Sequence, residues 1–153
     1  MGQDITLTAS DGFKLGAYRA DPAGAPKAAI VVIQEIFGVN HHIRSVCDRL
    51  ASSGYVAIAP SIFDRIEPNF QCGYSPDEVA NARKFVANPD WAAMLRDTQA
   101  AIDAVQDVGP VGIVGFCLGG SGLFYKKDRL YLKFRKGRLA GWKGDWGHNW
   151  MWQ

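Results

Sequence analysis

VGIVGFCLGG, residues 111–120, joins an uncharged apolar run to a cysteine set among glycines. Residues 111–116 predict a strand buried on both faces of a sheet, because the run contains no polar side chain. Cys117 then stands in the pattern Gly-x-Cys-x-Gly, which is typical of a sharp strand-to-helix turn that lifts a nucleophile clear of the sheet. Glycines suit this turn because larger side chains would collide with neighbouring backbone. We therefore expect a nucleophilic thiol at the end of a buried strand.

The main alternative is a structural cysteine buried in a glycine-rich turn, which could also bind a phosphate. The glycines between residues 112 and 120 do not form G-x-G-x-x-G in the register of a dinucleotide site, and no P-loop lysine follows them. The spacing after the strand therefore favours the nucleophile.

The chain before residue 111 alternates apolar strands with amphipathic helices. The expected elements are a hairpin over 4–20 that turns at Asp11-Gly12, strands at 27–35 and 55–60, and helices at 40–53, 76–86 and from about 91. Ser75 and Glu78 form a capping box at the start of the second helix. This alternation predicts right-handed crossovers, and hence an α/β fold with a mostly parallel sheet preceded by a hairpin.

Two of these helices carry an apolar face. In the first helix the face holds Ile43, Val46, Cys47, Leu50 and Ala51, and Gly54 is placed to end the helix. In the third helix the predicted stripe is Leu95, Thr98, Ile102 and Val105. We expect both faces to pack against the sheet.

Glu35 follows the strand at 27–35, where open α/β sheets build their sites. A carboxylate at the end of a buried strand favours a functional interpretation, in which Glu35 meets the thiol of Cys117 and restrains or activates it. The alternative is a carboxylate that caps a nearby helix.

Three motifs together resemble the dienelactone hydrolase family: QEIFGVN at 34–40, GYVAIAPSIFDR at 54–65 and GFCLGG at 115–120. The similarity covers residues 3 to about 121. It implies the N-terminal part of an α/β-hydrolase fold, incomplete on its C-terminal side. It also implies a carboxylic ester hydrolase of the carboxymethylenebutenolidase type, which opens a lactone or cyclic enol ester through a cysteine acyl-enzyme, with no cofactor and no metal.

The same resemblance implies roles for individual residues. Cys117 is the nucleophile, and Glu35 is the carboxylate that holds the resting thiol. The backbone N–H groups of Ile36 and Leu118 form the oxyanion hole.

Family substrates carry a carboxylate, so an arginine should line the pocket. Arg83 and Arg65 are the candidates, and the alternative for each is a solvent-facing surface residue. The sequence departs from the family at Ser61, which follows Pro60 where the family usually has aspartate.

A second departure concerns the general base. In this fold an aspartate and a histidine follow the nucleophile on later strands, whereas Asp145 and His148 are only three residues apart. His41 and His42, beside the Glu35 loop, are expected to face solvent. We therefore expect this chain to be impaired or inactive.

The chain changes character after Ser121. Residues 1–121 carry 9 Lys/Arg and 13 Asp/Glu, a net charge of −4, whereas residues 122–153 carry 8 Lys/Arg and 2 Asp, a net charge of +6. Four of the five tryptophans lie in the last twelve residues. We divide the chain into a hydrolase portion, 1–121, and a basic, Trp-rich tail, 122–153. Our hypothesis for the tail is a frameshift or a premature junction near codon 121, which would leave the hydrolase portion truncated.

Other readings of the tail remain open. Alternating apolar residues followed by RKGR favour a local hairpin. The net charge also admits a non-catalytic fragment whose tail binds a partner or polyanion, although composition gives nucleic-acid binding little support.

The composition of the whole chain, 153 residues with 48% hydrophobic residues and a net charge of +2, is that of a soluble globular protein. No apolar run is long enough to span a membrane and no signal peptide is recognisable, so we expect no membrane partner. Three widely spaced cysteines suit the cytoplasm. Because the predicted sheet ends at the strand before Cys117, we also expect self-association through an uncovered edge.

Overall fold

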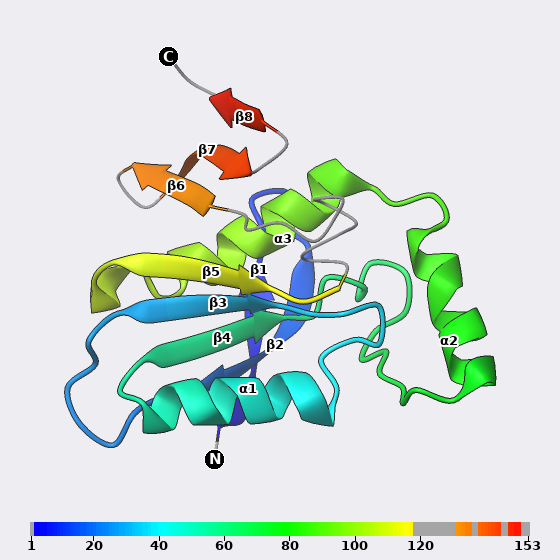
Figure 1. Cartoon of the computed structure of the whole chain (residues 1–153), viewed down its shortest axis with the longest axis horizontal. Helices are drawn as coiled ribbons and strands as arrows, with labels where there is room; N and C mark the ends of the chain where they lie inside the picture. Colours follow the sequence, from blue (N-terminus) through cyan, green and yellow to red (C-terminus); the bar gives the residue numbers. More distant parts are fainter. Residues whose placement is uncertain (1, 118–130, 136–137, 145–146, 151–153) are drawn as a thin grey trace.

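The computed structural model describes residues 2–117, 131–135, 138–144 and 147–150, and it describes side chains for residues 2–117. In that first range five strands form one sheet, with α1 and α3 on opposite faces (Figure 1). The strands are β1 (Gln3–Thr8), β2 (Lys14–Ala20), β3 (Ala29–Ile33), β4 (Val56–Pro60) and β5 (Val111–Gly115). The helices are α1 (His41–Ser52), α2 (Pro76–Arg83) and α3 (Trp91–Asp103), with short 3-10 turns at Lys84–Val86 and Gln106–Val108.

The strand order is β1-β2-β4-β3-β5. β3 lies between β4 and β5 and is parallel to both, whereas β2 is antiparallel to β1 and to β4. The hairpin turns where the sequence predicts, at Gly12, whose φ of +85° lies in the left-handed region that glycine adopts without strain. The predicted α/β class, with an N-terminal hairpin and a mostly parallel sheet, is confirmed.

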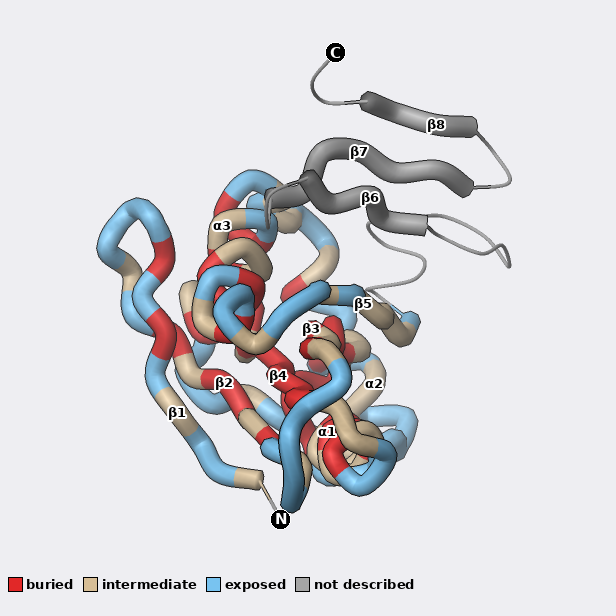
Figure 2. Tube along the Cα trace, turned by 90° about the vertical axis from the view of Figure 1, so that its left-hand side faces the viewer, coloured by how far each residue is buried: buried red, intermediate tan, exposed pale blue. Residues whose placement is uncertain are grey.

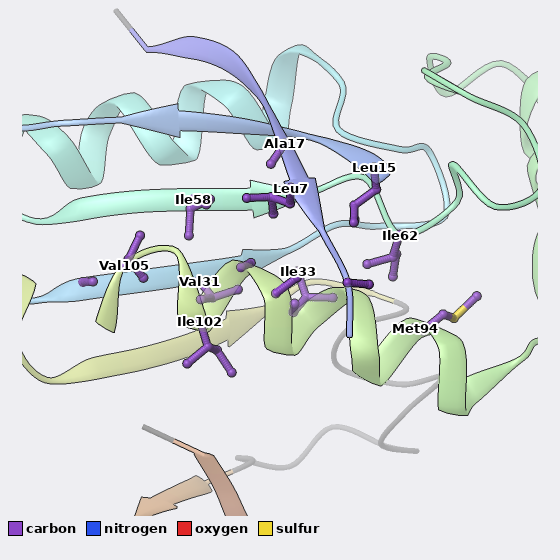
Figure 3. Close-up of a cluster of buried hydrophobic side chains, with 14 of the residues drawn as sticks. Leu7, Leu15, Ala17, Val31, Ile33, Ile58, Ile62, Met94, Ile102 and Val105 are labelled. Atoms are coloured by element: carbon purple, nitrogen blue, oxygen red, sulfur yellow. The ribbon is translucent and has the colours of Figure 1, made fainter. Parts of the chain in front are cut away.

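Successive residues of the central strands pack against different helices, as the two-residue period of a strand requires. Val31 and Ile33 of β3 join the cluster under α3 that Figure 3 shows, with Met94 and Ile102 from the helix. Val32, between them, joins the cluster on the α1 face. A strand buried on both faces needs apolar residues at every position, which explains the unbroken β-branched runs.

Each helix begins at a side chain that accepts a hydrogen bond from its first turn. Asn40 caps α1, Ser75 and Glu78 form the predicted capping box of α2, and Asp90 caps α3. α1 ends as predicted, because Gly54 at a φ of +94° donates its N–H to the Ala51 carbonyl. These caps set where each helix begins relative to the strand before it.

The prediction that β5 is buried on both faces is wrong. All five of its residues are half-buried or exposed, unlike β3 and β4, which are nearly all buried (Figure 2). The reason is its place at the end of the sheet: among the strands described within 2–117, β5 pairs only with β3. Self-association through this edge stays a prediction.

The stripe predicted for α3 is wrong at two of its four positions. Leu95 is 40% exposed and Thr98 is only half-buried, whereas Ile102 and Val105 are buried as expected. Asp97 is fully buried instead, on the side of α3 that packs against the rest of the fold. A pattern that counts only apolar residues cannot find a face that contains a buried carboxylate.

Beyond residue 130 the structure describes the backbone of three further strands, β6 (Tyr131–Arg135), β7 (Arg138–Gly144) and β8 (Gly147–Trp150). They form an antiparallel sheet in the order β6-β7-β8, with Arg135 opposite Arg138, so the predicted hairpin is confirmed. The division of the chain at Ser121 stays a prediction. Among the described residues, no helix is both long and apolar enough for a membrane crossing.

Candidate active site

Cys117 lies at the carboxyl end of β5 with its side chain exposed. Its φ of +51° is in the left-handed region, and among the described residues only Asn69 shares this conformation without being glycine. Phe116, just before it, donates its N–H to the Ile33 carbonyl at 3.2 Å, so pairing with β3 continues up to the cysteine. Left-handed backbone at a non-glycine residue costs about 1 kcal/mol or more and is concentrated at functional sites.

Glu35 lies at the same edge of the sheet as Cys117. Ile33 pairs with Gly115 in the β3–β5 register, and Glu35 and Cys117 each follow two residues later. The Glu35 carboxylate accepts a hydrogen bond from the Tyr74 hydroxyl at 3.0 Å. No hydrogen bond joins Glu35 to Cys117 within residues 2–117, and Glu35 caps none of the three helices.

The loop that carries Glu35 is anchored by two neighbours. The fully buried side chain of Gln34 accepts a hydrogen bond from the Ile62 N–H and donates one to the Glu35 carbonyl, both at 3.2 Å. Gly38 has a φ of +80° and lies so close to the Phe70 carbonyl that a side chain would overlap it. The backbone around Glu35 is therefore held on both sides.

Of the two proposed oxyanion-hole donors, the structure describes Ile36 but not Leu118. Ile36 is half-buried beside the α3-facing cluster, and no hydrogen bond from its N–H is found among the described residues. Within residues 2–117 nothing therefore competes with an oxyanion for that N–H. Leu118 lies outside the described residues.

The two candidate arginines also differ. Arg65 donates to both carboxylate oxygens of Asp97, at 2.8–3.2 Å, and to Asp11 at 3.0 Å. Its guanidinium therefore links parts of the fold, and this engagement speaks against a role in binding substrate. Arg83 is exposed in the last turn of α2 and has no ion pair among the described residues. The α2 helix lies beyond the carboxyl ends of the parallel strands (Figure 1).

His41 is exposed as expected, whereas His42 is half-buried and packs edge-on against Phe116 at 5.9 Å between ring centroids. Residues 40–42 and 71–74 line a shallow pocket of about 400 Å³. Asp145 lies outside the described residues, as does the side chain of His148. Among described residues no group of three His, Cys, Asp or Glu is placed to hold a metal.

Sequence reasoning missed the side chains that hold Glu35. Tyr74, Asn40 and Gln34 all contact it or its neighbours. Asn40 and Gln34 belong to the QEIFGVN motif and could have been noticed there. Tyr74 gives no local signal, because it lies 39 residues from Glu35.

The sequence model of the dienelactone hydrolase family matches residues 15–131 of this chain, about three quarters of its length. The chain belongs to the dienelactone hydrolase family. The matched range includes Glu35 and Cys117 and extends ten residues beyond Ser121.

Two relatives illustrate the similarity. A Synechocystis sp. protein assigned to the carboxymethylenebutenolidases is 43% identical over 113 residues, which cover 70% of this chain and 46% of that protein. The carboxymethylenebutenolidase of Pseudomonas putida is 35% identical over 135 residues, which cover 85% of this chain and 57% of that enzyme. The chain therefore spans about half the length of these relatives.

The fold is similar to that of solved family structures. A crystal structure from Klebsiella pneumoniae, assigned as a dienelactone hydrolase, matches with a TM-score of 0.61 and 33% identity over 78% of this chain and 52% of that one. The α/β-hydrolase assignment of this dienelactone hydrolase family member is thereby confirmed.

Proposed function

We propose that this chain is a carboxylic ester hydrolase of the carboxymethylenebutenolidase type, which opens a lactone or enol ester through Cys117. The observation that carries the proposal is the conformation of Cys117: an exposed thiol at a φ of +51°, at the end of a parallel strand. A structural cysteine would be buried, as Cys47 is, and would need no such backbone.

The first half of the reaction needs a nucleophile, a stabilised oxyanion and a leaving group. The Cys117 thiolate attacks the ester carbonyl carbon, and the tetrahedral oxyanion accepts hydrogen bonds from the N–H groups of Ile36 and Leu118. The carbon–oxygen bond to the leaving group then breaks, and the departing enolate takes up from solvent the proton that the thiol released to it on ionising. The product is a thioester on Cys117.

The second half needs water and a general base to hydrolyse the thioester. Among the described residues, no histidine is hydrogen-bonded to Cys117 or to Glu35. General acid–base catalysis contributes about 10²–10⁴-fold to such steps. We therefore propose that this chain is acylated readily and deacylated slowly.

Substrate recognition follows from charge. Arg83, at the end of α2, has no ion pair among the described residues and is suited to a substrate carboxylate. The proposed substrates are small anionic esters or lactones, and the proposed compartment is the cytoplasm.

Acylation can be tested with p-nitrophenyl acetate. We expect a burst of about one p-nitrophenolate per chain, followed by turnover slower by about 10²-fold or more, because the described residues offer the thioester no general base. Peptide mass spectrometry should find the acetyl group on Cys117. The Cys117→Ala variant should show no burst, whereas Cys72→Ala, which removes another thiol, should retain it.

The outcome that overturns the proposal is a burst that survives in Cys117→Ala, or an acetyl group found only on other residues. Fast turnover without accumulation would instead contradict the proposed impairment, because a competent base would then be present.

The second candidate is a non-catalytic fragment whose tail binds a polyanion, favoured by the net charge of +6 over residues 122–153. Its affinity for heparin should fall steeply with salt and be lost when residues 122–153 are deleted. Weak binding without salt dependence would exclude it.

A further inference from the structure

Tyr74 and Asn40 form a hydrogen-bonded chain that ends on Glu35. The Tyr74 hydroxyl donates its single proton to Glu35 Oε2 at 3.0 Å and accepts from Asn40 Nδ2 at 3.4 Å. The hydroxyl has only one proton, so it cannot donate to Asn40 while it donates to Glu35. The chain runs from Asn40 through Tyr74 to the carboxylate.

Asn40 is held rigidly. It is 6% exposed, its Oδ1 accepts from the Ile43 N–H as the cap of α1, and its Nδ2 also donates to the Cys72 carbonyl at 3.2 Å. One buried side chain thus joins the helix start, the loop at 69–74 and Tyr74. This amide fixes the place of the phenol oxygen.

Tyr74 itself is 56% exposed, yet it is not a loose surface residue. Its ring packs edge-on against Phe37 with centroids 4.6 Å apart. The backbone beside it is tied to the Glu35 loop by the bond from the Cys72 N–H to the Phe37 carbonyl, 3.0 Å long. Ring and hydroxyl are therefore placed independently, so the hydroxyl can be removed while the ring stays packed.

Glu35 has two neighbours that could engage its carboxylate. Tyr74 donates to it in this structure, whereas Cys117, at the same sheet edge, is not bonded to it among the described contacts. A hydrogen bond to a charged oxygen restrains the carboxylate and disperses its charge. A carboxylate released from the phenol is free to turn towards the thiol.

We propose that Tyr74 is a positioning residue that, held by Asn40, restrains Glu35 and so limits how strongly this carboxylate acts on the Cys117 thiol. The inference rests on the proposed function only in that Glu35 and Cys117 act together. Burial, opposed by the hydrogen bond from Asn40 and assisted by Glu35, raises the pKa of the Tyr74 phenol above the ordinary 10.0, so the hydroxyl carries its proton throughout the neutral range.

The direction of the effect follows from electrostatics. A negative charge close to a thiol disfavours the thiolate, and the thiolate is the reactive form. Without the phenol, Glu35 approaches Cys117 more often. The Tyr74→Phe variant should therefore react more slowly at Cys117 than the unmodified chain.

The experiment is a double-mutant cycle on the full chain, read as the rate of Cys117 alkylation by iodoacetamide from pH 6 to 9. We expect Tyr74→Phe to slow alkylation about threefold at pH 7–8, a modest effect because solvent screens exposed charges. Glu35→Gln should speed alkylation, and Tyr74→Phe should add no further change in that background. Tyr55→Phe, the same change at the residue just before β4, is the matched control.

Peptide mass spectrometry separates the three thiols. Burial raises the pKa of the Cys47 thiol to about 12, and burial together with Glu78 raises the pKa of the Cys72 thiol, so both react slowly at pH 7–8 and report on folding. Unchanged alkylation of Cys117 in Tyr74→Phe would overturn the proposal. An equal slowing with and without Glu35 would overturn it too, because Tyr74 would then act by another route.

A second measurement tests the bond directly. In a chain labelled with ¹³Cζ-tyrosine, the Tyr74 resonance is identified by its loss in Tyr74→Phe. Glu35→Gln should lower the pKa of Tyr74, and an unchanged titration would contradict the contact. Neither measurement needs substrate. If the acylation burst fails but Tyr74→Phe slows alkylation only when Glu35 is present, only the hydrolase proposal is rejected. If the burst is observed but Tyr74→Phe has the same effect with and without Glu35, only the role of Tyr74 is rejected.

Discussion

Replacing Arg65 with methionine is expected to lower the free energy of unfolding by about 3 kcal/mol, measured by urea denaturation at pH 7. Asp97 is the reason: its side chain is 1% exposed and is paired in a bidentate manner with a guanidinium that is 21% exposed. Without Arg65, the Asp97 carboxylate is still removed from water on folding, but the ion pair that offsets this desolvation cost is gone. Methionine retains most of the apolar contact with the Phe13 ring, which the guanidinium covers at 4.3 Å.

Two further variants separate charge from packing. Lys84→Met breaks an ion pair whose members are both more than half exposed, and should cost less than about 0.5 kcal/mol. The double variant Arg65→Met/Asp97→Leu should be more stable than Arg65→Met alone, because no buried charge is left unpaired. A loss in Arg65→Met as small as in Lys84→Met would contradict the argument.

The same arginine makes stability depend on pH. Its hydrogen bond to Asp11 holds the pKa of that carboxyl well below the ordinary 3.8. Because the pKa of Asp11 is lower in the folded chain than in the unfolded chain, its pairing with Arg65 contributes fully to stability above about pH 4. This contribution is lost as the pH falls through the pKa of Asp11 in the folded chain. Below pH 4, stability should therefore fall more steeply in the unmodified chain than in Arg65→Met, and equal slopes would argue against this link.

Replacing Gly38 with alanine is expected to cost at least about 3 kcal/mol in unfolding free energy. Part of the loss is backbone strain, since a φ of +80° costs an alanine about 1–2 kcal/mol. The rest comes from collision of the new methyl group with the Phe70 carbonyl. Because this is a backbone atom, the loop at 69–72 must move, and the bridge between Gly38 and Gln71 is lost.

Gly12 provides the matched control. Its φ of +85° is nearly the same, yet nothing lies within 4 Å of where a methyl group would stand. Gly12→Ala should therefore show the strain alone, about 1–2 kcal/mol. Equal losses in the two variants would show that the collision with Phe70 is relieved without cost.

The strands and caps of this fold were predictable because their signals are local. A few neighbouring residues suffice to predict each of these features: the buried strand β3 from its unbroken apolar run, the start of α2 from Ser75 and Glu78, and the end of α1 from Gly54. The exposure of β5 was not predictable, because it depends on which strand lies beside it. Burial of Asp97 was missed for the same reason: its partner Arg65 is 32 residues away.

In the candidate site, too, residues in local motifs were predictable, whereas contacts between distant loops were not. Cys117 and Glu35 follow from motifs at strand ends, and the register of β3 and β5 places them at one edge. The restraint on Glu35 by Tyr74 depends on two loops meeting, and no pattern within either loop encodes it.

The pairing of β5 with β3 has a consequence for the order of folding. Ile33 and Gly115 are partners although about 80 residues separate them, whereas β1 and β2 pair across a tight turn. Contacts between distant residues carry a larger loop-closure entropy and tend to form late. Cys117 directly follows that pairing, so we expect its left-handed backbone to form only after the rest of the sheet has assembled. In a nascent or partly unfolded chain we therefore expect this cysteine to have an ordinary backbone conformation, and any special reactivity of the thiol to arise late in folding.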